Sequence, residues 1–454
     1  MILPQAFRER MTGLLGEEAP LFFSALDEAP RRGATVDLSR CGEEALARSG
    51  FVTGKIPYEE NGVFVEGEGL GNHLLHLSGA LYLQDPGAMA PVAAVPIREG
   101  FRILDLCAAP GGKSIQAARK MGKGGVLVSN EFSPARCKVL LQNLERCGVA
   151  DSAVLNDDGE NLPAFFGSFF DLVILDAPCS GEGMFRKNPE SRDEWNEGNI
   201  RLSAERQKAL LGAAALLTRP GGYLSYSTCT FAPEENEWQI ADFLSAHPEF
   251  SLCDPGEAIR QNSRPGIFFP EKPLHDFALC RRFYPHASPG EGQFLALLKK
   301  SEAAPFLPMQ KQKEKPKKPH PDEKTVRDFL REVLVTEPEG ELLFRPDGVY
   351  LSPPVPLPEK RVFSPGIKLG TVRKGRMIPS HRFFTVFAAF CRNRIELFEG
   401  DERIARYLHG EELENIPGSG WAAVFAGKMP LGGAKISDSR AKNFYPKGLR
   451  APGD

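Results

Sequence analysis

The sequence lacks the features that mark secreted, membrane-spanning and zinc-binding proteins. Its nine cysteines are an odd number, lie far apart and include no CxxC pair, which argues against zinc ribbons and thioredoxin-type redox sites. The first charged residue, Arg8, precedes any apolar stretch of the kind found in a signal peptide, so no signal peptide is predicted. The longest apolar runs, such as residues 383–390, are far too short to span a bilayer. We therefore expect a cytoplasmic monomer without a metal site, in which most thiols are buried packing residues.

Two further absences limit which folds and which ligands are possible. No internal repeat is visible, and the phosphate-loop frame GxxxxGKS/T is missing although a glycine-rich turn is present. What remains is an ordinary globular composition, 42% hydrophobic and 25% charged over 454 residues. At roughly 150 residues per domain, this length suggests about three domains.

The net charge of −3 conceals an uneven distribution. Residues 1–300 contain 30 Lys and Arg against 39 Asp and Glu, whereas residues 301–454 contain 26 against 20. The basic half favours a polyanionic partner for the C-terminal part of the chain. An incidentally basic domain explains the same numbers equally well.

Hydrophobic periodicity divides the chain into segments of different type. Two short helices are predicted within residues 1–30, and short β-like runs lie within residues 50–85, so we interpret residues 1–95 as a small α+β domain. Residues 96–300 alternate between strands and helices, which indicates a parallel sheet with helices on both faces. The expected strands lie at 102–106, 125–128, 171–175 and 222–226, and the expected helices at 113–121, 133–147 and 203–217.

The C-terminal third begins with a stretch rich in Pro and Lys. Residues 301–324 cannot bury a core, so we predict a flexible linker there. Residues 325–454 contain short strands with many turn residues and are predicted to form a separate unit.

A glycine-rich turn follows the strand at 102–106. Small residues let the backbone approach a ligand, and the helix that follows offers free N–H groups to a carboxylate. Glu131 ends the next strand, where an acid can accept two ribose hydroxyls, and Asp158 follows the third predicted strand, within reach of an adenine amino group. Each acid alone is more often a loop or cap residue, but acids at successive strand ends favour a nucleoside site. The turn comprises Cys107, Ala108, Ala109, Pro110, Gly111, Gly112 and Lys113.

Two cysteines follow the fourth and fifth predicted strands. Cys179 lies just after Asp176, and Cys229 lies within residues 227–230. Ligands of open α/β sheets bind at the carboxyl ends of the strands, so both thiols are predicted to reach one crevice. A lone cysteine is usually a buried hydrophobic residue. Two cysteines at the carboxyl ends of adjacent strands, beside an acid, instead indicate a catalytic role.

Methylation of a cytosine ring explains such a pair of thiols. Carbon 5 of cytosine is a poor nucleophile towards a methyl sulfonium, and a thiolate that adds to carbon 6 makes it reactive. Hydrogen bonding or protonation at N3, which a carboxylic group can supply, supports that addition. A base then removes the proton from carbon 5, the thiol is expelled, and a second cysteine nearby could assist its release.

The motifs resemble those of the Sun/nucleolar-protein family of RNA cytosine-5 methyltransferases, and most closely its bacterial RsmF-like ribosomal RNA branch. The resemblance rests on residues 107–113, 178–179 and 228–229 and extends over nearly the whole chain. It implies a Rossmann-like class I methyltransferase domain that binds S-adenosyl-L-methionine through residues 107–113, Glu131, Asp158 and Asp176.

The resemblance also implies roles and a substrate. Cys229 would be the nucleophile, Cys179 would assist product release, Asp176 would face both cofactor and base, and Lys113 would face the active site. The implied reaction methylates carbon 5 of a cytosine in small-subunit ribosomal RNA, naked or in an assembled subunit, through a covalent bond between Cys229 and carbon 6. The N-terminal domain is expected to bind RNA.

The tail is similar to the PUA-like RNA-binding end of that branch, over residues 421–424, 430–435 and 442–450. Cations interleave there with Phe444 and Tyr445, as stacking on single-stranded bases requires, although a buried hairpin accounts for the aromatic residues equally well. The family's late Gly-Phe-Phe motif reads Gly292-Gln293-Phe294 here, and its N-terminal Arg-x-Asn segment is not evident near residues 31–36. If Phe294 packs against the target base, the change to Gln293 alters only the neighbour of that residue.

Four other classes of protein share some of these features. Enzymes that methylate exocyclic amino groups carry a related Asp/Asn-Pro-Pro-Tyr motif but need no thiol, which would leave Cys229 idle. DNA cytosine-5 methyltransferases use the proline–cysteine thiol, which would give the nucleophile's role to Cys179. A methyltransferase acting on tRNA, or an RNA-binding ribosome-assembly factor that no longer catalyses, are further alternatives. The basic tail favours RNA, and the intact cofactor motif with both cysteines favours catalysis.

Overall fold

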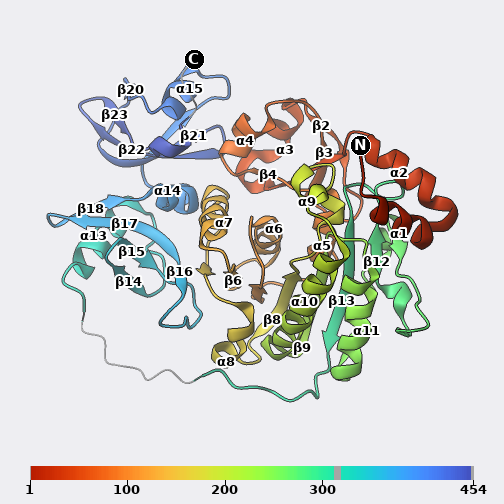
Figure 1. Cartoon of the computed structure of the whole chain (residues 1–454). Helices are drawn as coiled ribbons and strands as arrows, with labels where there is room; N and C mark the ends of the chain where they lie inside the picture. Colours follow the sequence, from red (N-terminus) through yellow and green to blue (C-terminus); the bar gives the residue numbers. More distant parts are fainter. Residues whose placement is uncertain (1, 311–318, 451–454) are drawn as a thin grey trace.

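The computed structural model describes residues 2–310 and 319–450 (Figure 1). The N-terminal part begins with the two predicted helices and continues into a small antiparallel sheet with strand order β2-β3-β1-β4. Its elements are α1 (Gln5–Leu15), α2 (Ala19–Asp27), β1 (Arg32–Val36), α3 (Leu38–Arg48), β2 (Val52–Lys55), β3 (Gly62–Val65), α4 (Leu74–Leu77) and β4 (Leu81–Leu83).

A large mixed sheet forms the centre, as the strand–helix alternation predicted. Its middle strands run in the order β13-β9-β8-β5-β6-β7, of which β9 to β7 are mutually parallel and β13 is antiparallel to β9. These strands are β5 (Arg102–Asp105), β6 (Val126–Asn130), β7 (Ser152–Leu155), β8 (Phe170–Asp176), β9 (Thr218–Thr228) and β13 (Gln293–Lys300). Shorter strands extend it, namely β10 (Phe250–Leu252), β11 (Arg264–Pro265) and β12 (Arg281–Phe283).

Helices cover both faces of this sheet. Leu172 and Ile174 of β8 point into a core shared with α5, α6 and α7, whereas Val173 and Leu175 point into a second core shared with α8, α10 and α11. This alternation explains why the strand reads as a continuous apolar run. The helices are α5 (Pro86–Ala93), α6 (Gly112–Lys120), α7 (Pro134–Arg146), α8 (Pro163–Phe166), α9 (Pro189–Asp193), α10 (Glu197–Leu217), α11 (Glu237–Ala246) and α12 (Glu257–Gln261).

The C-terminal part contains two further sheets, with orders β14-β15-β17-β18 and β19-β21-β22-β23-β20. Figure 1 shows them on the side of the molecule opposite α1 and α2. Their elements are α13 (Glu323–Val333), β14 (Leu342–Arg345), β15 (Gly348–Leu351), β17 (Ile367–Arg373), β18 (Arg376–Pro379), α14 (His381–Phe387), β19 (Arg394–Leu397), α15 (Glu402–His409), β20 (Leu413–Glu414), β21 (Gly420–Ala426), β22 (Met429–Ser437) and β23 (Arg440–Asn443).

The C-terminal part is tied to the central sheet more closely than a flexible linker suggests. Residues 301–310 of the predicted linker run along the central part, where Ser168 N donates to Leu307 O at 2.8 Å and Gln310 N donates to Phe165 O at 2.9 Å. Residues 311–318 lie outside the described residues. A further strand, β16 (Val362–Ser364), then pairs antiparallel with β7 and becomes the edge of the central sheet.

The three parts of the chain also meet at the C-terminal end of α7. Arg40 of α3 donates to Thr385 O at 3.1 Å and to Ser78 O at 3.0 Å. The Thr385 hydroxyl donates to Glu145 O at 2.7 Å, and the fully buried Arg382 of α14 donates to the Ser152 hydroxyl at 3.0 Å. These bonds link the N-terminal part to α14, and α14 to α7 and β7 of the central domain.

Candidate active site

The candidate site lies where the strand order of the central sheet reverses. From β5 the chain moves outward to β6 and β7 on one side of the sheet. It then crosses back to β8, on the other side of β5, and continues outward to β9. Open α/β sheets bind ligands at the carboxyl ends of strands at this switch point. The glycine-rich turn follows β5, and Gly111 has a φ of 113° that favours glycine. A Cβ on Gly112 would approach Tyr82 and Gln84 of the N-terminal part to 3.2 and 3.3 Å, so the turn is closely packed there.

A buried acid that the sequence analysis missed begins this turn. Asp105 at the end of β5 is 1% exposed, and its Oδ2 accepts a hydrogen bond from the Ser114 hydroxyl at 2.7 Å. Its Oδ1 has no hydrogen-bond partner among the described residues. Burial raises the pKa of Asp105 to about 7. An unpartnered carboxylate oxygen at the start of the turn suits a cationic group of a bound ligand.

Two of the three predicted cofactor acids line one cavity of ≈ 370 Å³, within the range of roughly 300–1,000 Å³ typical of small-ligand sites, whereas Asp176 does not line it, and of the predicted turn only Cys107 does. Glu131 and Asp158 lie on its wall with Cys107, and the Phe132 ring, 74% exposed, is on the wall as well. Asn130 ties the surrounding strand ends together, because its side-chain amide donates to Leu106 O and Asp157 O at 3.1 Å each. Glu131 and Asp158, predicted from separate strands, therefore share one preformed cavity.

The chemistry of this cavity fits S-adenosylmethionine. Two carboxylates can accept ribose hydroxyls and an adenine amino group, and an exposed aromatic ring can stack on a purine. Cys107 of the turn lies on the same wall, and the free Oδ1 of Asp105, two residues earlier in the chain, suits the cationic end of an amino-acid moiety. Glu131 Oε1 is already oriented, because Ser133 N donates to it at 2.9 Å.

The two cysteines meet as the sequence analysis predicted. The Sγ atoms of Cys179 and Cys229 lie 3.2 Å apart, and both side chains are partly exposed. The hydrogen bond with Cys229 and burial raise the pKa of the Cys179 thiol well above its usual value. Cys179 also lines a second cavity, of ≈ 360 Å³, formed with α9 and the N-terminal half of α10. Arg206 of α10 lines both cavities, and Pro178, next to Cys179 in the chain, lines the first.

Asp176 is held beside the cysteines by three donors. Lys113 Nζ lies 2.8 Å from its Oδ2, while the Ser227 hydroxyl and the Gln293 amide donate to its Oδ1 at 2.6 and 3.2 Å. Lys113 is nearly buried, whereas the Asp176 side chain remains 35% exposed. Phe294 is fully buried in the core and does not face the site, whereas Gln293 contacts the Asp176 carboxylate itself.

Two buried glutamates support the loops that carry the thiols. Glu235 accepts hydrogen bonds from Ser180 N at 3.0 Å and Gln207 Nε2 at 2.8 Å, and burial raises its pKa to about 7. Glu182 accepts from the Thr230 hydroxyl and Phe231 N at 2.8 Å each. Each glutamate thus links the loop after β8 to the segment that follows Cys229.

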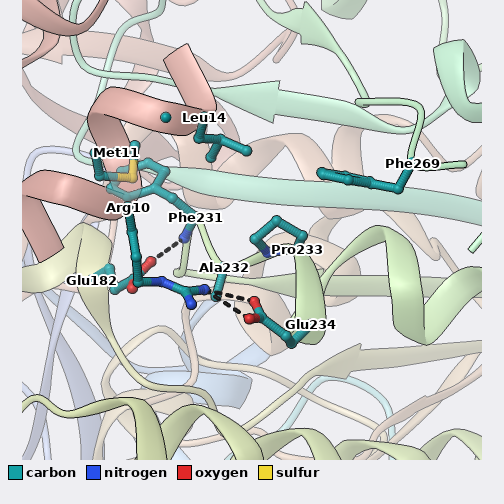
Figure 2. A pocket seen from close by; sticks show the side chains of 10 residues that line it. Arg10, Met11, Leu14, Glu182, Phe231, Ala232, Pro233, Glu234 and Phe269 are labelled. Atoms are coloured by element: carbon teal, nitrogen blue, oxygen red, sulfur yellow. Dashed lines mark hydrogen bonds and ion pairs between the residues drawn. The ribbon is translucent and has the colours of Figure 1, made fainter. Parts of the chain in front are cut away.

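The N-terminal helix α1 braces the same segment. Figure 2 shows a mostly apolar cavity of ≈ 290 Å³ between Met11 and Leu14 of α1 and the residues that follow Cys229. Arg10 closes one side by an ion pair with Glu234 at 2.8 Å. Phe231, on the wall of the cavity, is only 2% exposed. The N-terminal part therefore contributes to the position of the loop beside Cys229.

Of the two aromatic residues of the tail, Tyr445 is a core residue, as the buried-hairpin interpretation has it, whereas Phe444 is only partly buried. Tyr445 is 5% exposed and packs against Tyr407. Phe444 packs edge-on against Trp421 with ring centres 4.6 Å apart. Over residues 2–310 and 319–450, no group of His, Cys, Asp or Glu is arranged to hold a metal, and no helix is long and apolar enough to cross a membrane.

Comparison with known proteins assigns most of the chain. The family of 16S rRNA methyltransferase RsmB/F matches residues 92–299, the N-terminal domain of 16S rRNA methyltransferase RsmF matches residues 3–86, and the methyltransferase RsmF PUA domain matches residues 393–451. The solved structure of a methyltransferase homolog from Pyrococcus horikoshii superposes with a TM-score of 0.57 at 26% identity, over 65% of this chain and 95% of that one.

Full-length relatives carry a consistent name. Ribosomal RNA small subunit methyltransferase F of Salmonella arizonae is 33% identical, over 98% of this chain and 96% of that protein. The protein of the same name from Psychromonas ingrahamii is 30% identical, over 98% and 97%. These matches confirm the resemblance and the predicted fold class. The chain belongs to the family of ribosomal RNA small subunit methyltransferase F, whose members are S-adenosylmethionine-dependent enzymes.

Proposed function

We propose that this protein methylates carbon 5 of a cytosine in small-subunit ribosomal RNA, with Cys229 as the attacking thiol. The observation that carries the proposal is the placement of two cysteine sulfurs 3.2 Å apart, beside Asp176 and next to a nucleoside-sized cavity. An enzyme for exocyclic amino groups would have no use for this pair. The family's name supplies the ribosomal substrate, and with it a cytoplasmic site of action.

We assign cofactor binding to the cavity beside the glycine-rich turn. Residues 107–113 pass close to the amino-acid moiety, Glu131 accepts the ribose hydroxyls, and Asp158 accepts from the adenine amino group. Phe132 offers its exposed ring to the adenine face, and Asp105 receives the ammonium group. S-adenosylmethionine, when bound, supplies an electrophilic methyl group.

The Lys113–Asp176 pair activates the cytosine. Lys113, 2.8 Å from the carboxylate, provides a proton and a positive charge at the point where Asp176 meets N3 of the ring. Cys229, as thiolate, adds to carbon 6, and the electron pair of the 5,6 double bond makes carbon 5 nucleophilic. Ser227 and Gln293 fix Asp176 so that it points at the base rather than turning towards solvent.

Cys179 acts when the product leaves. After a base has taken the proton from carbon 5, the bond between carbon 6 and sulfur breaks, and its electron pair returns to Cys229. The raised pKa of Cys179 keeps its thiol protonated, so it can donate a hydrogen bond to the departing sulfur across 3.2 Å. The assignment makes Cys229 the nucleophile and Cys179 a group that stabilises it on release.

Methyl transfer from labelled S-adenosylmethionine tests the function directly. Small-subunit ribosomal RNA, assembled small subunits and tRNA are offered separately, and bisulfite mapping locates the labelled position. We expect 5-methylcytosine in ribosomal RNA. Label in tRNA alone would identify a tRNA enzyme, and no label in any substrate, with cofactor and RNA both bound, would identify an assembly factor without activity.

A further inference from the structure

The β17–β18 hairpin has an unusual turn. Arg373 ends β17 and Arg376 begins β18, so the connection consists of Lys374 and Gly375 alone. Both have positive φ angles, 50° and 67°, as two-residue turns of type I′ require. Such turns favour Asn, Asp or Gly at the first position, because a longer side chain is disfavoured in the left-handed region. Lys374 therefore occupies a position that local backbone preference does not explain.

Charge at this tip is also unfavourable for folding. Arg373 and Arg376 are direct cross-strand neighbours, and like charges placed opposite each other are destabilising. Together with Lys374 they are exposed, and no described residue forms an ion pair or side-chain hydrogen bond with them. By contrast, Lys368 on the same strand β17 is paired with Asp347 at 2.9 Å. Three cations are thus gathered where no anion among residues 2–310 and 319–450 pairs with them.

The position of the hairpin separates it from the known modules. It lies in the stretch between residues 299 and 393, which the methyltransferase and PUA family models leave uncovered. Figure 1 shows it at the outer edge of the molecule, on the side opposite α1 and α2. Of the apolar pair nearest the tip, Met377 is buried and Val372 is partly buried, so the tip exposes cations and no large apolar side chain of the kind that anchors protein interfaces.

We propose that Arg373, Lys374 and Arg376 form a contact site for the phosphate backbone of the RNA substrate. A backbone of closely spaced anions relieves the cross-strand repulsion and gives the strained Lys374 a partner. The site extends the RNA-binding surface beyond the PUA domain and reads no sequence, because it approaches phosphates and not base edges. The inference rests on the proposed function for the identity of the RNA.

Two variants of the full chain test this proposal. R373Q/R376Q removes two cations, and R98Q/K123Q is the matched control, because Arg98 and Lys123 are exposed and precede β5 and β6, away from the strand ends that form the active site. Binding to naked small-subunit ribosomal RNA is measured across a salt series. At roughly 1.4- to 5-fold per exposed ion pair, we expect R373Q/R376Q to bind about 2- to 25-fold more weakly. Its salt dependence should be shallower by about 1.5 in log–log slope.

A third variant separates binding from folding. K374N places a favoured residue in the turn, so it should raise the melting temperature while lowering RNA affinity. Affinity for S-adenosylmethionine should remain that of the unmodified chain in all three variants. Unchanged RNA affinity and salt slope in R373Q/R376Q would overturn the proposal, and unchanged affinity in K374N would remove Lys374 from the site.

Assembled small subunits distinguish RNA from protein as the partner. If R373Q/R376Q binds naked RNA normally but binds assembled subunits weakly, the hairpin contacts a ribosomal protein and the proposal is overturned. These are binding measurements, so they remain readable even if the unmodified enzyme fails to methylate ribosomal RNA, which would refute the proposed function alone.

Discussion

The sulfur atoms of Cys179 and Cys229 lie 3.2 Å apart, although the residues are 50 positions apart in the sequence. They meet because β8 and β9 are adjacent parallel strands with Asp176 in register with Ser227, so both loops leave the sheet at the same edge. The hydrogen bond with Cys229 and burial raise the pKa of the Cys179 thiol well above its usual value. We infer that Cys179 stays protonated and assists release, while Cys229 attacks.

Loss of Cys179 should trap the reaction part-way. C179A retains the nucleophile but lacks the thiol that stabilises Cys229 as it departs, so a covalent protein–RNA adduct should accumulate on a denaturing gel. The double variant C179A/C229A is the control and should show no adduct. Normal turnover of C179A without a slow-migrating band would exclude the assigned role.

The cofactor acids should each contribute to affinity for S-adenosylmethionine. E131A and D158A each remove charge-assisted hydrogen bonds worth about 1.5–3 kcal/mol, which corresponds to roughly 10- to 150-fold weaker binding. Isothermal calorimetry measures this, and E160A provides a control, because Glu160 lines the same cavity but is exposed and has no assigned contact. Unchanged affinity in both E131A and D158A would refute the placement of the cofactor.

Asp105 should make stability depend on pH. Its pKa is about 7 in the folded chain and about 3.9 when unfolded, so the folded state holds one more proton between these values. The free energy of unfolding should therefore fall as pH rises from about 4 to about 7. D105N lacks this effect, so without cofactor its stability relative to the unmodified chain should improve on going from pH 5 to pH 8, by up to a few kcal/mol.

Chemical denaturation at the two pH values measures this difference. The same variant should bind S-adenosylmethionine more weakly, because the amide replaces the oxygen that is free to accept the ammonium group. If the free energies of unfolding of D105N and the unmodified chain change in the same way with pH, Asp105 is ionised over the whole pH range.

The C-terminal part should influence the cofactor cavity through Arg361. This residue, just before β16, pairs with Asp157, which lines the cavity next to Asp158. Because exposed ion pairs are weak, R361A should reduce affinity for S-adenosylmethionine only about 1.4- to 5-fold, and R361K should restore most of it. An affinity of R361A equal to that of the unmodified chain would show that β16 completes the sheet without affecting the cavity.

Much of the site could be predicted because parallel strands place their ends together. Glu131, Asp158, Asp176, Cys179 and Cys229 all follow apolar runs that read plainly as strands, and the structure gathers them at one edge of the sheet. Phe132 and Asp105 adjoin the predicted residues and were missed because exposure and an unpartnered oxygen are properties of the folded chain.

Other features depend on contacts between distant residues, which no local sequence pattern predicts. Gln293 reaches Asp176 from an antiparallel strand 117 positions later in the chain. The short strand β16 lies within a stretch rich in proline, and only its pairing with β7 makes it a strand. Phe444 and Tyr445 pack into the core although their segment is basic, because the rings of Trp421 and Tyr407 cover them.

The identity of the attacking thiol is the central claim, and mapping a trapped adduct tests it most directly. RNA that carries 5-fluorocytosine at the target position cannot lose a proton from carbon 5, so the bond between protein and carbon 6 should persist after methyl transfer. Digestion and mass spectrometry then identify the modified peptide, with C229A and C179A analysed in parallel. We predict an adduct on Cys229 that is absent in C229A and retained in C179A. An adduct on Cys179, or one that survives in C229A, would contradict the account.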